Sequence, residues 1–184
     1  VNDTDGLTVY NLTLLGNTYR DQAMFDSARA IYRLALKSFG TAEKHHLSTL
    51  YKNFAILNIK LWNNQEALKY LDSATSILQE FPDVYTQLDI WTTYGHVYQN
   101  LLQFDKSREY FTKMCASAQN LEDYFHQIKC LIRNAHLDYR TGNLPKALQS
   151  GLEALKLIEL YNYPPQHVEA LIQVGLIYTR LSQF

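Results

Sequence analysis

The sequence predicts an all-α fold, a right-handed superhelical solenoid of antiparallel helix pairs, and three observations lead to this prediction. Small residues return at spacings of 39 or 40 residues along the chain, and a second small residue follows each of the first four after 12 residues. Apolar side chains around them repeat at the spacing of one helix face. A register held over five copies is typical of a repeat array, because a single helix pair cannot bury its apolar face alone.

Each copy opens with a predicted amphipathic helix centred on a small residue, which we call the anchor. Positions four before and three after the anchor lie on the same helix face as the anchor itself, and both are mostly large and apolar. This spacing therefore predicts the buried face of the first helix in each copy. The five anchors are Gly16, Ala55, Gly95, Ala135 and Gly175. The apolar residues around them are Leu12, Tyr19, Tyr51, Trp91, Tyr98, Leu131, Leu171 and Tyr178.

A second helix is predicted after a short turn in each of the first four copies. Asn63 and Asn143 stand where its free backbone N–H groups need capping side chains. Glycine inside a helix costs about 1 kcal/mol relative to alanine. Glycine at three anchors therefore indicates close helix contact, in which each anchor meets the small residue twelve positions later. The residues suited to the first turn of the second helix are Asp26, Asp105 and Pro145. The small residues twelve after the anchors are Ala28, Ala67, Ser107 and Ala147.

This pattern resembles the tetratricopeptide repeat, most closely over residues 9–36 and 90–111. The second and fourth copies depart from it, with Asn58 and Asp138 where an aromatic residue is expected and Gly151 in place of the second-helix aromatic. The period is about 40 residues here, whereas the family period is about 34. Longer repeats of this sort resemble those of bacterial regulatory and sensor proteins, including peptide-pheromone receptors.

The register predicts a single array over residues 1–184, with four helix pairs and an unpaired ninth helix. The last copy stops at Phe184, where its second helix should begin. We therefore expect the apolar face of Leu171, Val174 and Tyr178 to be unmated, and the chain to be a fragment of a longer protein. The predicted repeats are residues 9–47, 48–87, 88–127 and 128–167, followed by the first helix of a fifth at 168–184.

Composition and charge exclude several classes of function. The net charge is −1, from 17 basic and 18 acidic side chains, and the longest basic cluster is the short run 44–46. Nucleic-acid binding needs a basic surface that neutralises phosphates, so it is not expected. No apolar run approaches the 18 or so residues of a membrane-spanning helix. The sequence leaves the compartment open between cytoplasm and periplasm, and it leaves the oligomeric state open.

No convergent set of catalytic residues is visible, so we expect a protein that is not an enzyme and has no cofactor. Cys115, His126 and Cys130 come nearest to a metal site, but a closed zinc site needs four ligands and the fourth is missing. Two cysteines do not make a disulfide framework. We therefore interpret Cys115 and Cys130 as ordinary packing residues at the junction of the third and fourth copies, and expect no metal.

A candidate binding surface lies on the first helices. Residues at −3, +1 and +4 from each anchor form a stripe about a third of a turn from the core face, which we call the inner stripe. It mixes hydrogen-bonding, cationic and apolar side chains, as a peptide-binding groove does. The predicted ligand-binding residues, on this stripe or beside it on the helix that carries His136, are Asn17, Arg20, Lys52, Ile56, Thr92, His96, Gln99, Lys129, Ile132, Arg133, His136, Tyr139 and Arg140.

The predicted function is that of a protein- or peptide-binding module, such as the sensory region of a bacterial regulator. His96 and His136 share a repeat position and should lie side by side, and Lys129, Arg133 and Arg140 favour a ligand with an acidic group. The residues with which family members hold a C-terminal carboxylate are incomplete in both possible windows, which disfavours that clamp. The alternative is a structural scaffold or self-association domain whose groove is filled by its own chain.

Overall fold

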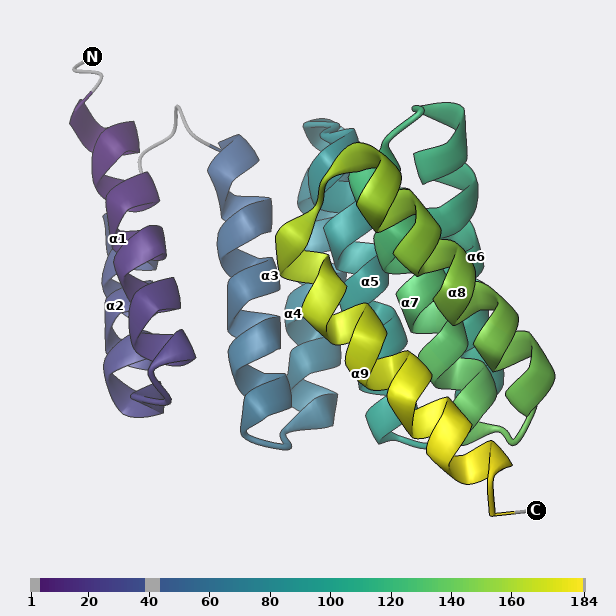
Figure 1. Ribbon diagram of the computed structural model, residues 1–184. Helices are drawn as coiled ribbons and strands as arrows, with labels where there is room; N and C mark the ends of the chain where they lie inside the picture. The colour runs from purple at the N-terminus through teal and green to yellow at the C-terminus, as the bar shows by residue number, and fades with distance from the viewer. Residues whose placement is uncertain (1–3, 39–43, 184) are drawn as a thin grey trace. The chain divides into compact units, whose positions relative to one another are not determined.

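A computed structural model describes the backbone of residues 4–38 and 44–183 and the side chains of residues 9–38 and 46–183. Over these residues the chain forms nine α-helices and no β-strand (Figure 1). The predicted all-α class of antiparallel helix pairs is confirmed. The helices are α1 (Thr4–Asp21), α2 (Phe25–Lys37), α3 (Lys44–Lys60), α4 (Asn64–Glu80), α5 (Val84–Asn100), α6 (Phe104–Asn120), α7 (Tyr124–Arg140), α8 (Leu144–Tyr161) and α9 (Pro164–Leu181).

The chain packs as two compact units, residues 1–101 and residues 102–184. In the first unit α1 pairs with α2 and α3 pairs with α4, while α5 packs on both α3 and α4. In the second unit α7 packs on α6, α8 and α9, and α8 also contacts α9. The odd-numbered helices are the predicted first helices of the five copies, and the even-numbered ones are the predicted second helices.

The turn inside each of the first four copies reverses the chain through one residue in the left-handed region. Ala23, Trp62, Leu102 and Gly142 have φ values of 59°, 61°, 57° and 85°. All four stand seven positions after an anchor, so the turn follows the same register as the helices. Only Gly142 is of the type that adopts this conformation without steric cost, because the other three carry a Cβ atom.

The helix caps differ in part from the prediction. Asn63 and Asn143 occupy the N-cap positions of α4 and α8, but neither side chain caps a backbone N–H group. Side-chain caps occur instead at two of the first helices: Asp83 accepts from the backbone N–H of Tyr85 at 3.1 Å in α5, and Asp123 caps α7. The predicted capping role of the two asparagines is therefore wrong, although the helix boundaries that they mark are right.

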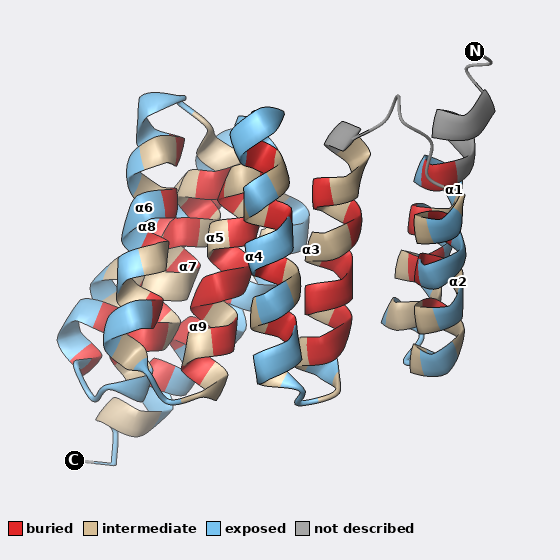
Figure 2. Cartoon of the chain, turned by 180° about the vertical axis from the view of Figure 1, so that it is seen from behind, coloured by how far each residue is buried: buried red, intermediate tan, exposed pale blue. Residues whose placement is uncertain are grey.

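The buried faces of the helices follow the predicted register in the first four copies (Figure 2). The fifth copy departs from it, because Gly175 is exposed and a Cβ atom built there would have no neighbour within 4 Å. Close packing around the small positions is therefore a property of the four complete copies. The buried small residues are Gly16, Ala28, Ala55, Ala67, Gly95, Ser107, Ala135 and Ala147.

The tightest contact at Gly16 is with an aromatic ring of the second helix. A Cβ atom built on Gly16 would overlap the ring of Tyr32, sixteen positions later. The fully buried Tyr32 ring continues into an aromatic cluster, with Phe54 edge-on at 5.2 Å and Tyr70 stacked on Phe54 at 4.8 Å between ring centroids. Glycine at this anchor therefore makes room for an aromatic ring.

Two positions of the fourth copy lack the aromatic residue that the repeat pattern predicts. One holds a residue in an ion pair, and the other packs against a residue of the next helix. Asp138, at a position where an aromatic residue is typical, is 1% exposed and accepts from Arg108 of α6 at 2.7 Å. Gly151 of α8 lies against Val174 of α9, whose Cγ2 would be 2.7 Å from a Cβ atom built at Gly151. Both departures from the repeat pattern thus have a structural counterpart.

Cys115 of α6 and Cys130 of α7 form a disulfide bond, with a Cα–Cα distance of 5.4 Å. The interpretation of these cysteines as ordinary packing residues is wrong, although they do lie at the junction of the third and fourth copies. Sequence spacing could not decide the pairing, because it depends on how two neighbouring helices face each other. No group of three or more potential metal ligands occurs among the residues that the structure describes.

The last helix, α9, shows part of the exposed apolar face that the register predicts. Leu171 and Tyr178 are 50% and 52% exposed, but Val174 is only 6% exposed because it packs on Gly151. The prediction of an unmated face is therefore confirmed for two residues and wrong for Val174. Phe184, where we expect the array to be interrupted, lies outside the described residues. In the part of the chain that the structure describes, no helix combines the length and apolarity needed to cross a membrane.

Candidate functional site

The first helices contact one another as well as their pair partners. In the first unit α3 packs against both α1 and α5, and in the second unit α7 packs against α9. A side chain on the inner stripe therefore points either toward a neighbouring first helix or toward the surface between the two. This geometry explains why members of the stripe differ in burial.

The thirteen predicted site residues fall into three groups by exposure. Thr92, Gln99 and Ile132 are buried, at 7%, 3% and 2% exposed. The Thr92 hydroxyl donates to the Leu88 carbonyl in its own helix at 2.9 Å, so its polar atom is used internally. These three residues contribute to helix packing. Only Arg140 is exposed, and the partly buried residues are Asn17, Arg20, Lys52, Ile56, His96, Lys129, Arg133, His136 and Tyr139.

In the first unit, Asn17 and Arg20 form a network with Tyr32. The Tyr32 hydroxyl donates to Asn17 Oδ1 at 2.7 Å, and Arg20 Nη1 donates to the same oxygen at 3.2 Å. Arg20 also pairs with Asp21 at 2.9 Å. Burial raises the pKa of Tyr32 to about 12, despite the opposing charge of Arg20. Both acceptor sites of the Asn17 amide oxygen are thus occupied within the molecule.

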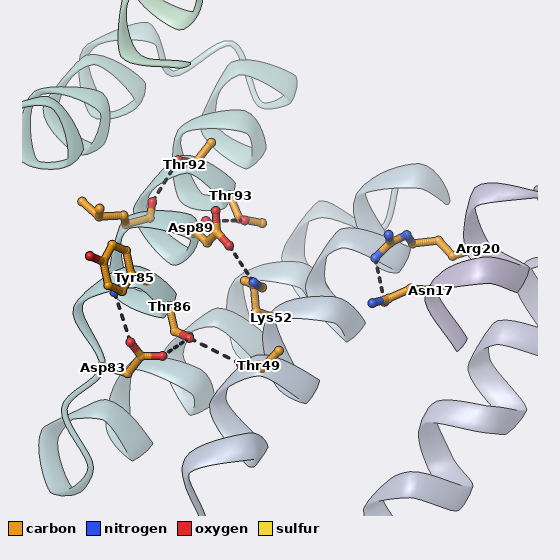
Figure 3. Close-up of polar contacts among 11 residues, drawn as sticks. Asn17, Arg20, Thr49, Lys52, Asp83, Tyr85, Thr86, Asp89, Thr92 and Thr93 are labelled. Atoms are coloured by element: carbon orange, nitrogen blue, oxygen red, sulfur yellow. Dashed lines mark hydrogen bonds and ion pairs between the residues drawn. The ribbon is translucent and has the colours of Figure 1, made fainter. Parts of the chain in front are cut away.

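A second polar network joins α3 to α5 (Figure 3). Lys52 Nζ of α3 lies 2.8 Å from Asp89 Oδ2 of α5, and Thr49 and Thr86 hydroxyls meet at 3.4 Å. The Lys52 side chain is 12% exposed, and that of Asp89 is 36% exposed. The predicted cation at Lys52 is therefore neutralised by a carboxylate on the next first helix.

The second unit presents a row of basic residues on α7. Lys129, Arg133, His136 and Arg140 are spaced by 4, 3 and 4 residues, so they share one face of the helix. We call this row the basic stripe. Arg133 Nη1 lies 2.6 Å from Glu169 Oε1 of α9.

Aromatic rings support the two ends of the basic stripe. The Lys129 ammonium lies 5.1 Å from the centroid of the Phe125 ring, and the Arg140 guanidinium lies 5.5 Å from that of Phe104. Both distances are those of cation–π contacts, which hold a cation in place without neutralising its charge. An aromatic ring thus fixes the position of the cation at each end of the basic stripe.

His136 sits in the middle of the basic stripe, and its environment favours the neutral imidazole. Burial lowers the pKa of His136, and the positive charges of Arg140 and Arg133 lower it further, while Glu169 acts in the opposite direction. Since an unperturbed histidine titrates near pH 6.5, His136 is uncharged at neutral pH. It therefore acts there as a hydrogen-bonding group rather than as a cation.

The two histidines that share a repeat position belong to different units. His96 lies on α5 in the first unit, and His136 lies on α7 in the second unit. Each is partly buried. Their predicted side-by-side placement stays a prediction.

The carboxylates that pair with the predicted site residues Lys52 and Arg133 were not predicted from the sequence. Asp89 and Glu169 each stand six positions before an anchor, and their partners Lys52 and Arg133 precede them by 37 and 36 residues. Opposite charges that recur at nearly one repeat length are the pattern that could have revealed them. Arg180, also missed, donates to the Tyr139 carbonyl at 3.1 Å.

Comparison with known proteins supports the repeat assignment. The tetratricopeptide repeat family model matches residues 9–39 and 88–120, which correspond to most of the first copy and most of the third. No curated protein matches the sequence significantly.

Solved structures with the same fold cover nearly the whole chain, at low sequence identity. A Rap protein complexed with Competence and Sporulation Factor has a TM-score of 0.85 at 17% identity, with 99% of this chain and 51% of that chain covered. The signal transduction ATPase (STAND) protein with a tetratricopeptide repeat sensor from Pyrococcus horikoshii has a TM-score of 0.80 at 15% identity, with 94% and 26% covered. The Rap conjugation gene regulator of plasmid pLS20, in complex with the Phr* peptide, has a TM-score of 0.69 at 16% identity, with 96% and 54% covered.

The chain thus spans between about a quarter and about half of the length of these three proteins. The resemblance predicted from the register is confirmed by the two family matches and by the shared fold. Residues 9–39 and 88–120 thus match the tetratricopeptide repeat, and the chain shares the all-α fold of a solved tetratricopeptide repeat sensor and of a Rap protein.

Proposed function

We propose that this chain is a non-enzymatic module that binds a peptide or protein segment on its first helices, as the sensory or interaction region of a regulatory protein. The basic stripe of α7 is the observation that carries the proposal. It places Lys129, Arg133, His136 and Arg140 on one helix face, with Glu169 as the ion-pair partner of Arg133. Such a surface suits a ligand with an acidic group, since guanidinium groups bind carboxylates through charge-assisted hydrogen bonds.

Two of the structurally similar proteins are named as complexes, one with Competence and Sporulation Factor and one with the Phr* peptide. In the Pyrococcus horikoshii protein the repeats are named as a sensor. These names favour a recognition role for a chain of the same fold. The net charge of −1 favours a protein or peptide partner over a nucleic acid.

The test uses two pools of fluorescein-labelled decapeptides, one with Asp or Glu at alternate positions and one with Asn or Gln there. Fluorescence anisotropy should show saturable binding of the acidic pool and weaker binding of the neutral one. Arg133→Gln with Arg140→Gln should lower the affinity for the acidic pool at least fivefold. The control is the double variant Lys146→Gln with Lys156→Gln, on the exposed face of α8. It removes the same charge and should leave the affinity for the acidic pool unchanged. Equal losses in both variants would show that net charge, rather than this surface, attracts the peptides.

Self-association is the second candidate, and α9 is the feature that favours it. Leu171, Ile172 and Leu176 are 50%, 59% and 47% exposed on this helix. Grouped apolar residues of this kind mark contact surfaces. Sedimentation equilibrium of the wild type and of Ile172→Asp distinguishes the candidates, because a dimer that the substitution dissociates would favour the scaffold role.

A further inference from the structure

The disulfide bond crosses a junction between two repeats. Cys115 belongs to the second helix of the third copy and Cys130 to the first helix of the fourth, 15 residues further on. Non-covalent contacts at the same junction include Gln127 Nε2, which donates to the Ala118 carbonyl at 3.2 Å. The bond therefore fastens α7, which carries the basic stripe, to α6.

The two cysteines of the disulfide differ in their exposure to solvent. Cys130 is buried, at 8% exposed, whereas Cys115 is partly exposed. A thiolate from outside must approach a sulfur atom along the S–S axis, and Cys115, as the more exposed of the two residues, is the more accessible target. The leaving group of that exchange is then the Cys130 thiolate.

A buried thiolate needs a hydrogen-bond donor, because burial disfavours the charged form. Asn134 supplies one from the next turn of α7. Its Nδ2 atom lies 3.5 Å from Cys130 Sγ and 3.6 Å from Cys115 Sγ. The side-chain amide is thus in place to stabilise the sulfur that leaves and to contact the sulfur that is attacked.

We propose that Cys115 is a thiol-exchange site for a dithiol reductant, and that the state of the Cys115–Cys130 bond controls how firmly α7 is held on α6. One thiolate of the reductant attacks Cys115 Sγ, the bond to Cys130 breaks, and Cys130 leaves as a thiolate that takes a proton from water. The second thiolate of the reductant then attacks the mixed disulfide. It releases Cys115 and closes the disulfide of the oxidised reductant, so two electrons pass to the protein.

The first test measures the release of thiols from the folded, oxidised chain in excess dithiothreitol, with the rate of global unfolding measured separately. Reduction should be proportional to dithiothreitol concentration and at least tenfold faster than unfolding. A rate that equals the unfolding rate at every concentration would overturn the proposal, because the bond would then open only when the chain unfolds. Two free thiols in the chain purified without reductant would overturn it as well.

The second test examines the role of Asn134 and the consequence for α7. Asn134→Leu should slow the reduction several-fold, whereas Asn120→Leu at the exposed end of α6 should not. Reduction should lower the thermal midpoint by about 6–12 °C. It should also raise amide hydrogen exchange in α6 and α7. In the double variant Cys115→Ser with Cys130→Ser, dithiothreitol should change neither the thermal midpoint nor the amide hydrogen exchange. Unchanged hydrogen exchange in the reduced wild type would rule out control of α7.

Discussion

The Lys52 ammonium lies 2.8 Å from the Asp89 carboxylate and joins α3 to α5, and the Arg133 guanidinium joins α7 to α9 through Glu169 at 2.6 Å. In both units a cation of one first helix is thus paired with an acidic residue six positions before the next anchor. The cations predicted to bind a ligand therefore also hold neighbouring first helices together. A ligand carboxylate must compete with these internal carboxylates.

Replacement of Glu169 by glutamine should raise the affinity for the acidic peptide pool, because it removes the internal competitor for Arg133. Stability should change by less than about 1 kcal/mol, since the Glu169 side chain is 44% exposed and such pairs are weak. Anisotropy titration and urea unfolding measure the two quantities. Glu159→Gln, exposed on α8, is the matched control, and an equal gain in affinity there would refute the competition.

Two glycines should respond in opposite directions to substitution by alanine. Gly16→Ala should destabilise the chain by about 1–3 kcal/mol, because the new Cβ atom would overlap the buried Tyr32 ring. Gly175→Ala should stabilise it by up to about 1 kcal/mol, because the site is open and alanine favours helix. Urea denaturation measures both. Stabilisation by Gly16→Ala would mean that helix propensity outweighs packing at this site, and destabilisation by Gly175→Ala would mean that Gly175 is not open.

The pair Arg108–Asp138 allows a test of a buried carboxylate. Arg108→Met should cost about 2 kcal/mol, less than the 3–5 kcal/mol or so of a fully buried pair because Arg108 is 38% exposed. The Arg108→Met substitution leaves the Asp138 carboxylate charged and buried. Asp138→Leu added to Arg108→Met should restore most of the loss, as an apolar pair needs no counter-charge. Additive losses in the double variant, measured by urea unfolding, would contradict this account.

His136 should make the chain less stable as the pH falls. Its pKa is lowered in the folded state, by burial first and then by Arg140 and Arg133, against Glu169. Below about pH 6.5 His136 is protonated in the unfolded chain but still neutral in the folded chain. Protonation therefore favours the unfolded chain, and the free energy of unfolding decreases with falling pH. The decrease is complete once the pH lies below the folded pKa.

Urea unfolding at pH 8 and pH 5 provides the measurement, with His136→Gln as the comparison. The variant should lose less stability than the wild type between the two pH values, since the other histidines are common to both. Parallel losses would mean that His136 titrates normally in the folded chain.

Much of the fold could be predicted from the sequence alone. The helix type, the five anchors and the turns depend on spacings within one helix or one helix pair, which the 3.6-residue period links directly to the amino-acid order. Ala135 on α7 illustrates this, because its full burial follows from its place as an anchor in the register. The inner stripe was predicted only in part, since Thr92, Gln99 and Ile132 on it are buried.

Only the tertiary structure decided which side chains meet across helices. The disulfide of Cys115 with Cys130, the ring of Tyr32 against Gly16 and the pairing of Lys52 with Asp89 all join different helices. Each depends on the rotation and translation of one helix relative to its neighbour. Sequence periodicity fixes which face of a helix is apolar, but a shift of a few ångströms between two such faces changes every partner without changing the pattern.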